Sequence, residues 1–490
     1  MKNRKLRGKR VLGLAIRVLG VSTLVLILLV PIYIAVTNHL GHRAAESVIR
    51  EAAKLNALPQ PPEDVPDEDN GSPLLRAAAF ALSDPYDYED NVPAVGGADW
   101  PRFGERFTEE QAAIVREMVD RNTTVFELVD RAAAKPHFQY DIEWRIFAWQ
   151  DVMSILSETR SLTRWQEVRS LDAQARADTQ TAVQAVTAAF AISRSLNAHD
   201  LLLTHMVQVS IDALTIEIIE SMLSRLELEE PALHEMAQSL ERSHEKLNFG
   251  DILRGEVAIM IPSISHPRWG WISGEYERAR WFVHQSNVYN DLVRESGGED
   301  TELMDLGDIM SHTSFWDFFS NALVGTYFTW VPGHQQLIGA DGAKEVLDLL
   351  QQYESTKNQP RALIHLAENG PSDGPAEYLS HAISANLDIQ TRLRVANTAM
   401  LVEGYRVSNG EWPASLQDLE GSIPTDEYGQ PLRLQRTKRG VVVYSVGANG
   451  LDEKGVNASE DKTRGEEDDV TFELLKPDRR SVSPAPKEPE

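Results

Sequence analysis

The side chains best suited to catalysis in this chain are its histidines and carboxylates, but their spacing matches no common catalytic motif. His234-Glu235 and His244-Glu245 each begin like the zinc-binding motif H-E-x-x-H, and neither has the second histidine four positions after the first. We also find no G-x-S-x-G, no P-loop, and no G-x-G-x-x-G after a strand. We therefore interpret both pairs as positions on the surface of a helix, and the sequence favours a protein that is not an enzyme.

Arginine and aromatic side chains alternate in the segment 265–335. Guanidinium groups stack on indole rings and bind anions, so this pattern predicts a groove for an anionic or sugar ligand. The alternative is a bulky core in which the arginines pair with the chain's many carboxylates. The candidate ligand-binding residues are Arg268, Trp269, Trp271, Arg278, Arg280 and Trp281.

A third group of residues lies in the segment 376–475, where a long helical pattern is followed by a hairpin pattern and an acidic loop. The residues that carry this pattern are Tyr405, Asn409, Gly410 and Pro413, then Asp426 to Pro431, then Tyr444 to Gly450, and finally Asp469 and Val470. In order and spacing, this segment resembles the globular head of the major pseudopilins of type II secretion. The resemblance covers this segment alone.

In the pseudopilins the corresponding loop binds calcium, so the resemblance implies a Ca²⁺ site here. Ca²⁺ takes about six to eight oxygen ligands, and glycines let a short loop surround the ion. Asparagine stands at one position where the family has an aspartate, and the loop is longer and more acidic than in the family. The alternative is a solvated acidic loop with no specific ion. The candidate ligands are the carbonyl of Val446 and the side chains of Asn449, Asp452, Asp468 and Asp469.

The chain differs from a pseudopilin in its architecture. In that family the membrane helix runs directly into the head and begins with a processing site and a glutamate. Here a long helical segment separates the two, and the apolar run carries no acidic residue. We therefore interpret the segment 376–475 as a head-like module within a different kind of protein.

The elements that hold these residues are predicted to be mostly helical. Thr108 and Gln111 form a capping box, a typical helix start, and Asn409-Gly410 is a typical helix end. We expect an N-terminal transmembrane helix, an irregular α-helical bundle or solenoid-like domain over 74–370, and a small α+β module over 376–475. Further helices are predicted at 142–156, 165–196, 199–226, 231–247 and 376–408, and strands at 432–435, 441–446 and 470–474.

The run from Val18 to Val36 contains no charged residue and predicts the transmembrane helix. At about 1.5 Å per residue it is about 28 Å long, close to the thickness of the hydrocarbon core. The preceding tail, 1–17, is basic, so we expect it in the cytoplasm and the rest of the chain on the other side. The alternatives are a cleaved signal peptide and a buried core helix.

Composition limits the partners. The net charge is −26 despite the basic tail, which argues against binding nucleic acid. The chain has no cysteine, so disulfides and thiolate-bound metals are excluded. Residues 37–73 predict a stalk helix and a proline-rich acidic linker, and 476–490 a disordered tail.

Together these patterns predict a single-pass protein of the inner membrane of a bacterium. Its extracytoplasmic body would be a non-enzymatic interaction or scaffold protein, with unknown envelope proteins as partners and calcium in its C-terminal module. One alternative is an accessory component of a type II secretion or pilus-like machine. A second alternative is an envelope hydrolase with a cleft in the helical domain.

Overall fold

The computed structural model describes most of the helical part of the chain and the C-terminal sheet. Among the described residues, the structure is mostly helical with one three-stranded antiparallel sheet, as predicted. The basic tail 1–17, most of the run Val18 to Val36, and the segment 266–331 lie outside the described residues. Described are residues 29, 31–58, 65–82, 103–140, 149–198, 201–244, 249–265, 332–368, 375–419, 423–455 and 469–480.

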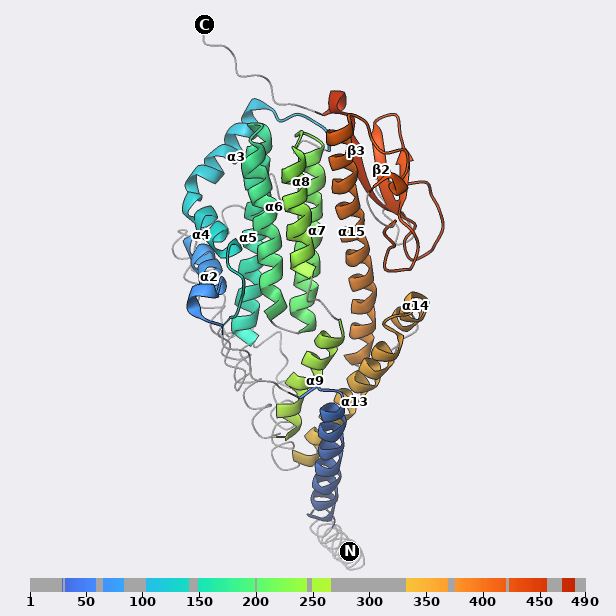
Figure 1. The fold of residues 1–490 in the computed structure, drawn as a ribbon. Coiled ribbons are helices and arrows are strands. Elements are labelled where there is room, and N and C mark those ends of the chain that lie inside the picture. Colours follow the sequence, from blue (N-terminus) through green and yellow to red (C-terminus); the bar gives the residue numbers. More distant parts are fainter. Residues whose placement is uncertain are drawn as a thin grey trace, which may run out of the picture. The chain divides into compact units, whose positions relative to one another are not determined.

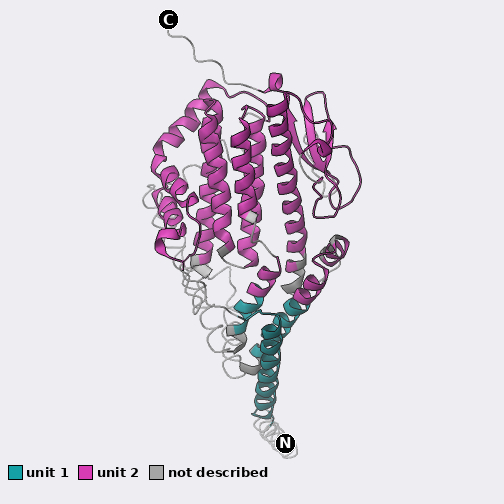
Figure 2. Ribbon diagram, in the orientation of Figure 1, with its two compact units in different colours: residues 1–60, 256–348 teal, residues 61–255, 349–490 magenta. Residues whose placement is uncertain are grey.

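The chain forms two compact units, which Figure 2 shows in different colours. The first unit comprises residues 1–60 and 256–348. Its N-terminal helix is continuous over residues 31–54, so the predicted stalk continues the end of the apolar run without a break. The side chains of Thr37, Ala45 and Ala52 lie on the buried side of this helix.

The second unit comprises residues 61–255 and 349–490. Its helices α5, α6, α7, α8 and α15 lie side by side, and the sheet packs against α15 (Figure 1). Helices α9 and α13 each cross the boundary between the units. The helices are α2 (Ser72–Ala81), α3 (Glu109–Arg121), α4 (Thr123–Ala133), α5 (Trp149–Ala175), α6 (Thr179–Ser195), α7 (Leu202–Leu223), α8 (Glu230–His244), α9 (Phe249–Ser265), α13 (Pro332–Thr356), α14 (Pro360–Glu368) and α15 (Pro375–Asn409).

The first of the predicted helix starts is confirmed at α3. The Thr108 hydroxyl accepts a hydrogen bond from the Gln111 N–H, and the Gln111 side chain accepts one from the Thr108 N–H. The helix then ends at Arg121, because the Asn122 side chain donates to the Met118 carbonyl at 3.1 Å and α4 begins at the next residue.

The boundary between α5 and α6 differs from the prediction. We expected one helix to end near Leu156 and the next to begin near Trp165 and continue to Leu196. Instead α5 continues through the stretch between Leu156 and Trp165, where the Thr159 and Thr163 hydroxyls donate to carbonyls four residues earlier. The break comes at Ala177, whose φ of 56° ends the helix.

Helices α7 and α8 begin and end within a few residues of their predicted positions. Among the described residues, α7 is the one helix that is long and apolar enough to cross a membrane. However, 44% of its most apolar window is buried inside the protein, and core helices pass the same test. We assign α7 to the core, because Ile218, Ile219 and Met222 pack there.

The C-terminal elements agree closely with the prediction. Helix α15 ends at Asn409, and Gly410 follows with a φ of 79°, a left-handed conformation that glycine adopts easily. The strands pair in the order β1-β2-β3, all antiparallel. Their bounds are β1 (Arg433–Arg436), β2 (Gly440–Ser445) and β3 (Val470–Leu475).

One hydrophobic core joins the helical body to the sheet. It contains Phe190 of α6, Met222 of α7, Met236 of α8, Leu393 of α15 and Phe472 of β3. Helix α15 packs against α7 and α8 on one side and against β2 and β3 on another. The predicted boundary near residue 370 therefore separates two sequence patterns that share a core.

Two segments predicted as linker or tail are held against the body. The short 3₁₀ helix η1 (Asp67–Asp69) is followed by Asn70, whose side chain donates to the Gln139 carbonyl and accepts from the Gln139 N–H. Another 3₁₀ helix, η6 (Pro477–Arg479), precedes Arg480, which is only 5% exposed. The first residues of the predicted tail, 476–480, are therefore ordered against the body.

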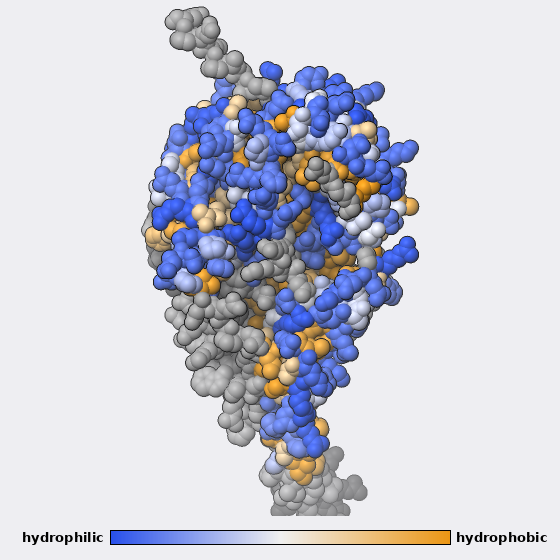
Figure 3. All heavy atoms as spheres, viewed as in Figure 1, coloured by the Kyte–Doolittle hydropathy of each residue, from blue (hydrophilic) through white to orange (hydrophobic). Residues whose placement is uncertain are grey.

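The surface carries the acidic character of the sequence. On the face drawn in Figure 3, hydrophilic residues cover most of the second unit. Hydrophobic residues gather on the N-terminal helix where its description begins. This helix therefore differs in surface character from the second unit.

Candidate functional site

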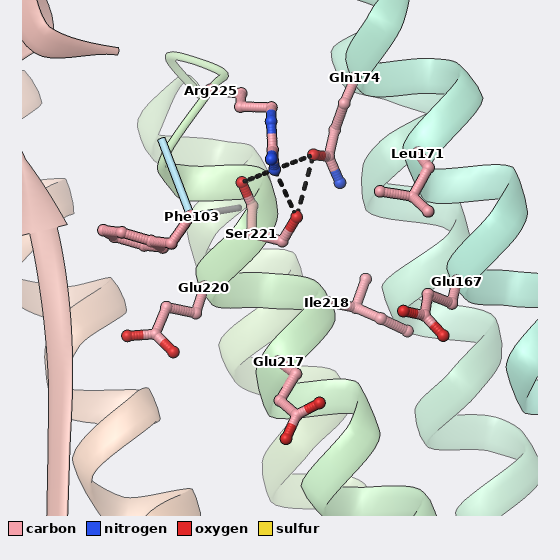
Figure 4. Close-up of a pocket in the computed structure, with 9 residues that line it drawn as sticks. All are labelled: Phe103, Glu167, Leu171, Gln174, Glu217, Ile218, Glu220, Ser221 and Arg225. Carbon is pink, nitrogen blue, oxygen red and sulfur yellow. Dashed lines mark hydrogen bonds between the residues drawn. The ribbon is translucent and has the colours of Figure 1, made fainter. Parts of the chain in front are cut away.

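The predicted ligand-binding residues of the arginine- and tryptophan-rich segment lie outside the described residues. A pocket instead appears in the second unit, between α5 and α7, with a volume of about 210 Å³ (Figure 4). It is lined by Phe103, Glu167, Leu171, Gln174, Glu217, Ile218, Glu220, Ser221 and Arg225.

The spacing of these residues explains why they share a pocket. Glu167, Leu171 and Gln174 are three or four positions apart and lie on one face of α5. Glu217 and Ser221 are likewise four apart on α7. Because α5 and α7 pack against each other, the two faces meet along the pocket.

One end of the pocket is closed by Arg225. Its guanidinium donates to the Gln174 side-chain oxygen at 3.0 Å and to the Ser221 hydroxyl at 2.6 Å. It also donates to the Glu105 carbonyl and lies over the Phe107 ring. Burial lowers the pKa of Arg225 to about 10, although nearby Glu105 acts in the opposite direction. The guanidinium therefore holds the surrounding loop in place.

Glu220 points away from the rest of the pocket. Figure 4 shows its side chain extending to the side opposite Glu167. Its carboxylate accepts a hydrogen bond from the Glu473 N–H at 3.1 Å, so a side chain of α7 covers the edge of β3. This contact gives Glu220 a structural role, because an uncovered sheet edge exposes unpaired backbone groups.

Glu167 has the most unusual environment in the pocket. Burial raises its pKa to about 8, repulsion from Glu217 adds to the shift, and Arg164 opposes it. At neutral pH this carboxyl is therefore largely protonated, whereas an ordinary glutamate, with a pKa of about 4.3, is ionised. Figure 4 shows the Glu167 side chain extending from α5 toward Ile218 of α7, while the Glu217 side chain leaves α7 in a different direction.

A protonated carboxyl beside a second carboxylate can donate or accept a proton, or bind a cation. Acid–base catalysis would also require a reacting group held within hydrogen-bond distance. Within the described ranges, the pocket contributes one hydroxyl, that of Ser221, and it is bound to Arg225 and Gln174.

The predicted calcium ligands are distributed around the loop that follows β2. Val446 is buried, and the Asn449 side chain accepts a hydrogen bond from the Leu451 N–H. Asp452 is exposed and pairs with Arg433, and its Oδ1 accepts from the Tyr444 hydroxyl at 3.2 Å. Asp468 lies outside the described residues.

Asp469 is only 5% exposed, and the structure brings Glu453 beside it. Its Oδ2 accepts from the Gly455 N–H at 2.7 Å. Its Oδ1 and the Glu453 Oε2 are buried, and neither has a hydrogen-bond partner in the described structure. Burial raises the pKa of Asp469 to about 6, the Gly455 N–H opposes this, and Glu453 adds to it.

The structure thus joins Asp469 with Glu453 instead of with Asn449 or Asp452. Among the described residues, no three acidic or histidine side chains lie close enough to hold one metal ion. The sequence placed Glu453 in the loop only as one of several acidic residues.

Sequence reasoning missed Glu167 and Glu217 entirely. In a chain with 74 acidic residues, two carboxylates on different helices give no local signal. Only the structure shows that Glu167 lies between the buried residues Gln166 and Val168.

Comparison with protein-family models, with curated proteins and with solved structures found no match for this chain.

Proposed function

We propose that this chain is a single-pass protein of the bacterial inner membrane whose body lies outside the cytoplasm and binds envelope proteins. The observation that carries the proposal is an exposed apolar stripe on the N-terminal helix. Leu29, Ile32, Tyr33, Val36 and Leu40 recur every three or four positions and are 49–59% exposed. Residues at this spacing form one face of a helix.

The other side of the same helix is already covered by protein. Small residues predominate there, including Gly41 and Ala45, and they are buried. An apolar face left outside the fold needs an apolar surrounding, and the stripe continues the charge-free run from Val18. A lipid bilayer supplies that surrounding, and the basic tail 1–17 then favours a cytoplasmic N-terminus.

Membrane insertion is testable with the full chain in bacterial cells. We expect alkaline carbonate to leave the parent chain in the membrane fraction. The double variant Leu29→Arg/Ile32→Arg should appear in the soluble fraction, because each arginine opposes insertion by about 3 kcal/mol. His39→Arg, exposed on the same helix, is the matched control and should remain in the membrane.

Orientation needs a separate measurement. A reporter fused after Glu490 should be active only outside the cytoplasm. Extraction of the parent chain by carbonate would contradict the anchor, and a cytosolic reporter would contradict the orientation.

We propose that the loop between β2 and β3 binds Ca²⁺ through Asp469 and Glu453. Two adjacent carboxylates with unsatisfied buried oxygens, Asp469 Oδ1 and Glu453 Oε2, suit a divalent cation. The Val446 carbonyl and water would supply further oxygen ligands, because Asn449 and Asp452 are bound to other protein groups. The bound ion would neutralise the repulsion between the two carboxylates and hold the loop against the sheet.

Ion linkage provides the test for calcium. If Ca²⁺ binds only the folded protein, a hundredfold excess over Kd stabilises it by about 2.7 kcal/mol. The full chain should melt at a higher temperature in calcium than in chelator. Asp469→Asn should abolish the difference, and Asp120→Asn, on the exposed side of α3, should retain it. Equal melting temperatures of the parent chain at millimolar calcium would exclude the site.

A second candidate function is an accessory of a type II secretion or pilus-like machine. It is supported by the order of α15, the β1–β2 hairpin and β3, which follows the order of elements in a pseudopilin head. Because α7 and α8 cover one side of α15, we expect contact with a fibre through the sheet side of the module. A cysteine introduced at Leu451, which is 64% exposed, should then cross-link to pseudopilin subunits. Absence of such cross-links in secreting cells would contradict the accessory role and favour the scaffold role.

A further inference from the structure

We infer that the pocket between α5 and α7 binds an aliphatic ammonium group, such as a lysine side chain or a linear diamine, between Glu167 and Glu217. This site is independent of the proposed anchor and of the proposed calcium loop. It lies wholly within the second unit, and most of its lining residues come from α5 and α7.

The shape of the pocket suits a narrow, flexible chain with a charged end. Leu171 of α5 and Ile218 of α7 supply apolar surface next to the two carboxylates, and the ring of Phe103 lines another part. Methylene groups pack on such a surface while the ammonium group stays at the polar side. The volume of about 210 Å³ accommodates one such chain.

The charge distribution also favours a cation. The single cationic side chain that lines the pocket, Arg225, is held at one end by Gln174 and Ser221. Glu220 is bound to the backbone of β3. Among the described residues, Glu167 makes no hydrogen bond and no ion pair. Its carboxyl can therefore accept a hydrogen bond from a ligand.

An organic cation fits better than a metal ion. Divalent ions such as Ca²⁺ require about six or more oxygen ligands, and of the three carboxylates that line this pocket Glu220 is bound to the backbone of β3. An ammonium group has three donors and is satisfied by two carboxylates and water.

Binding should release a proton. Burial and repulsion from Glu217 raise the pKa of Glu167 to about 8, and Arg164 of α5 acts in the opposite direction. An ammonium group beside Glu167 favours the carboxylate, so affinity should rise between pH 6 and pH 8. Glu220 and Arg225 also line the pocket, but Glu220 is turned away and bound to the backbone of β3, and Arg225 is bound to Gln174 and Ser221.

Calorimetry on the full chain in detergent tests the inference, with 1,5-diaminopentane and N-acetyl-lysine amide as probes. We expect both probes to bind, with proton uptake by the buffer at pH 7. 1-Pentanol, which lacks the charge, should bind at least tenfold more weakly. Binding of the diamine alone would assign the site to free amines, and binding of both probes would include protein lysines.

Variants distinguish binding in the pocket from non-specific attraction of cations to the acidic surface. Glu167→Gln and Glu217→Gln should each weaken binding about tenfold or more. Glu235→Gln, an exposed position on α8, should bind like the parent chain. Thermal melting checks that each variant is folded, and the proton release of the parent chain provides a readout that needs no variant. Equal affinity in all three variants, or no binding of either probe, would overturn the inference.

Discussion

At the scale of single residues, the most constrained ionic group is Glu403 on α15. It is fully buried, and it accepts hydrogen bonds from Arg406 at 2.8 Å and from Arg480 at 2.5 Å. Burial alone would raise its pKa, but the Arg406 hydrogen bond and the charges of Arg480 and Arg406 outweigh it and hold the pKa below the usual value. A buried carboxylate in this position connects the end of the described chain to the long helix.

Glu403→Gln should destabilise the protein at neutral pH, because removing one partner of a buried pair costs about 3–5 kcal/mol. The lowered pKa of Glu403 means that the native state binds fewer protons than the unfolded state. The ionic contribution is therefore complete above the unfolded pKa of about 4.3 and is lost as the pH falls through the lower folded value. Urea unfolding at pH 7 and in acid should show this loss in the parent chain.

The matched control is Glu411→Gln, an exposed position just beyond the end of the same helix. It should unfold like the parent chain at both pH values. A difference between Glu403→Gln and the parent chain that did not decrease in acid would contradict the ionic explanation.

The sequence singled out isolated residues only where a local motif marked them. Asp469 was selected because it closes a recognisable loop, and the structure places it in a buried acidic pair with Glu453. Glu167 and Glu217 are far apart in the chain and become neighbours only when α5 packs on α7. No short pattern could have indicated that contact.

At the scale of elements, starts and stops with side-chain signals were predicted, and breaks without them were not. The capping box before α3, the Asn-Gly end of α15 and all three strands are confirmed. The α5–α6 break was misplaced, since the stretch between Leu156 and Trp165, which includes Thr159 and Thr163, is helical. Both threonines satisfy their hydroxyls on the helix itself and are buried by tertiary packing.

The break after α5 leads to a prediction about Ala177. Its φ of 56° is left-handed, a conformation that alanine adopts at a cost and glycine adopts freely. Ala177→Gly should therefore raise the free energy of unfolding by about 1 kcal/mol.

Ala175→Gly, two residues earlier at the end of α5, provides the control for this change. It should lower stability by about 0.5–1 kcal/mol, because glycine is unfavourable within a helix. Thermal melting of both variants would make the comparison, and equal shifts would show that the turn is not under backbone strain.

At the scale of the whole molecule, the second unit has one core to which both of its chain segments, 61–255 and 349–490, contribute. Residues of α6, α7 and α8 pack with residues of α15 and the sheet. The change of sequence pattern near residue 370 was visible, but the shared core was not, because periodicity shows which face of a helix is apolar without showing its partner. The resemblance to a pseudopilin head covers only the segment 376–475, so it suggested a separate module.

A shared core predicts a shared unfolding transition. Phe472→Ala in β3 and Met236→Ala in α8 should each cost about 2–5 kcal/mol, since both side chains are fully buried. In either variant, hydrogen exchange should accelerate in both α6 and β2. Leu401→Ala, a partly exposed position on α15, should leave exchange nearly unchanged. Acceleration confined to the substituted element would show that the body and the sheet unfold independently.

The shared core also has a consequence for biosynthesis. A ribosome completes α8 well before it reaches α15, and at about 5–20 residues per second the interval between His244 and Pro375 is about 7 to 26 seconds. During that interval the apolar faces of α6 to α8 lack the residues that cover them in the finished protein. A holding chaperone would have to protect this nascent intermediate from aggregation. A premature stop codon before α15 should accordingly yield a product that proteases remove, and not a smaller working protein.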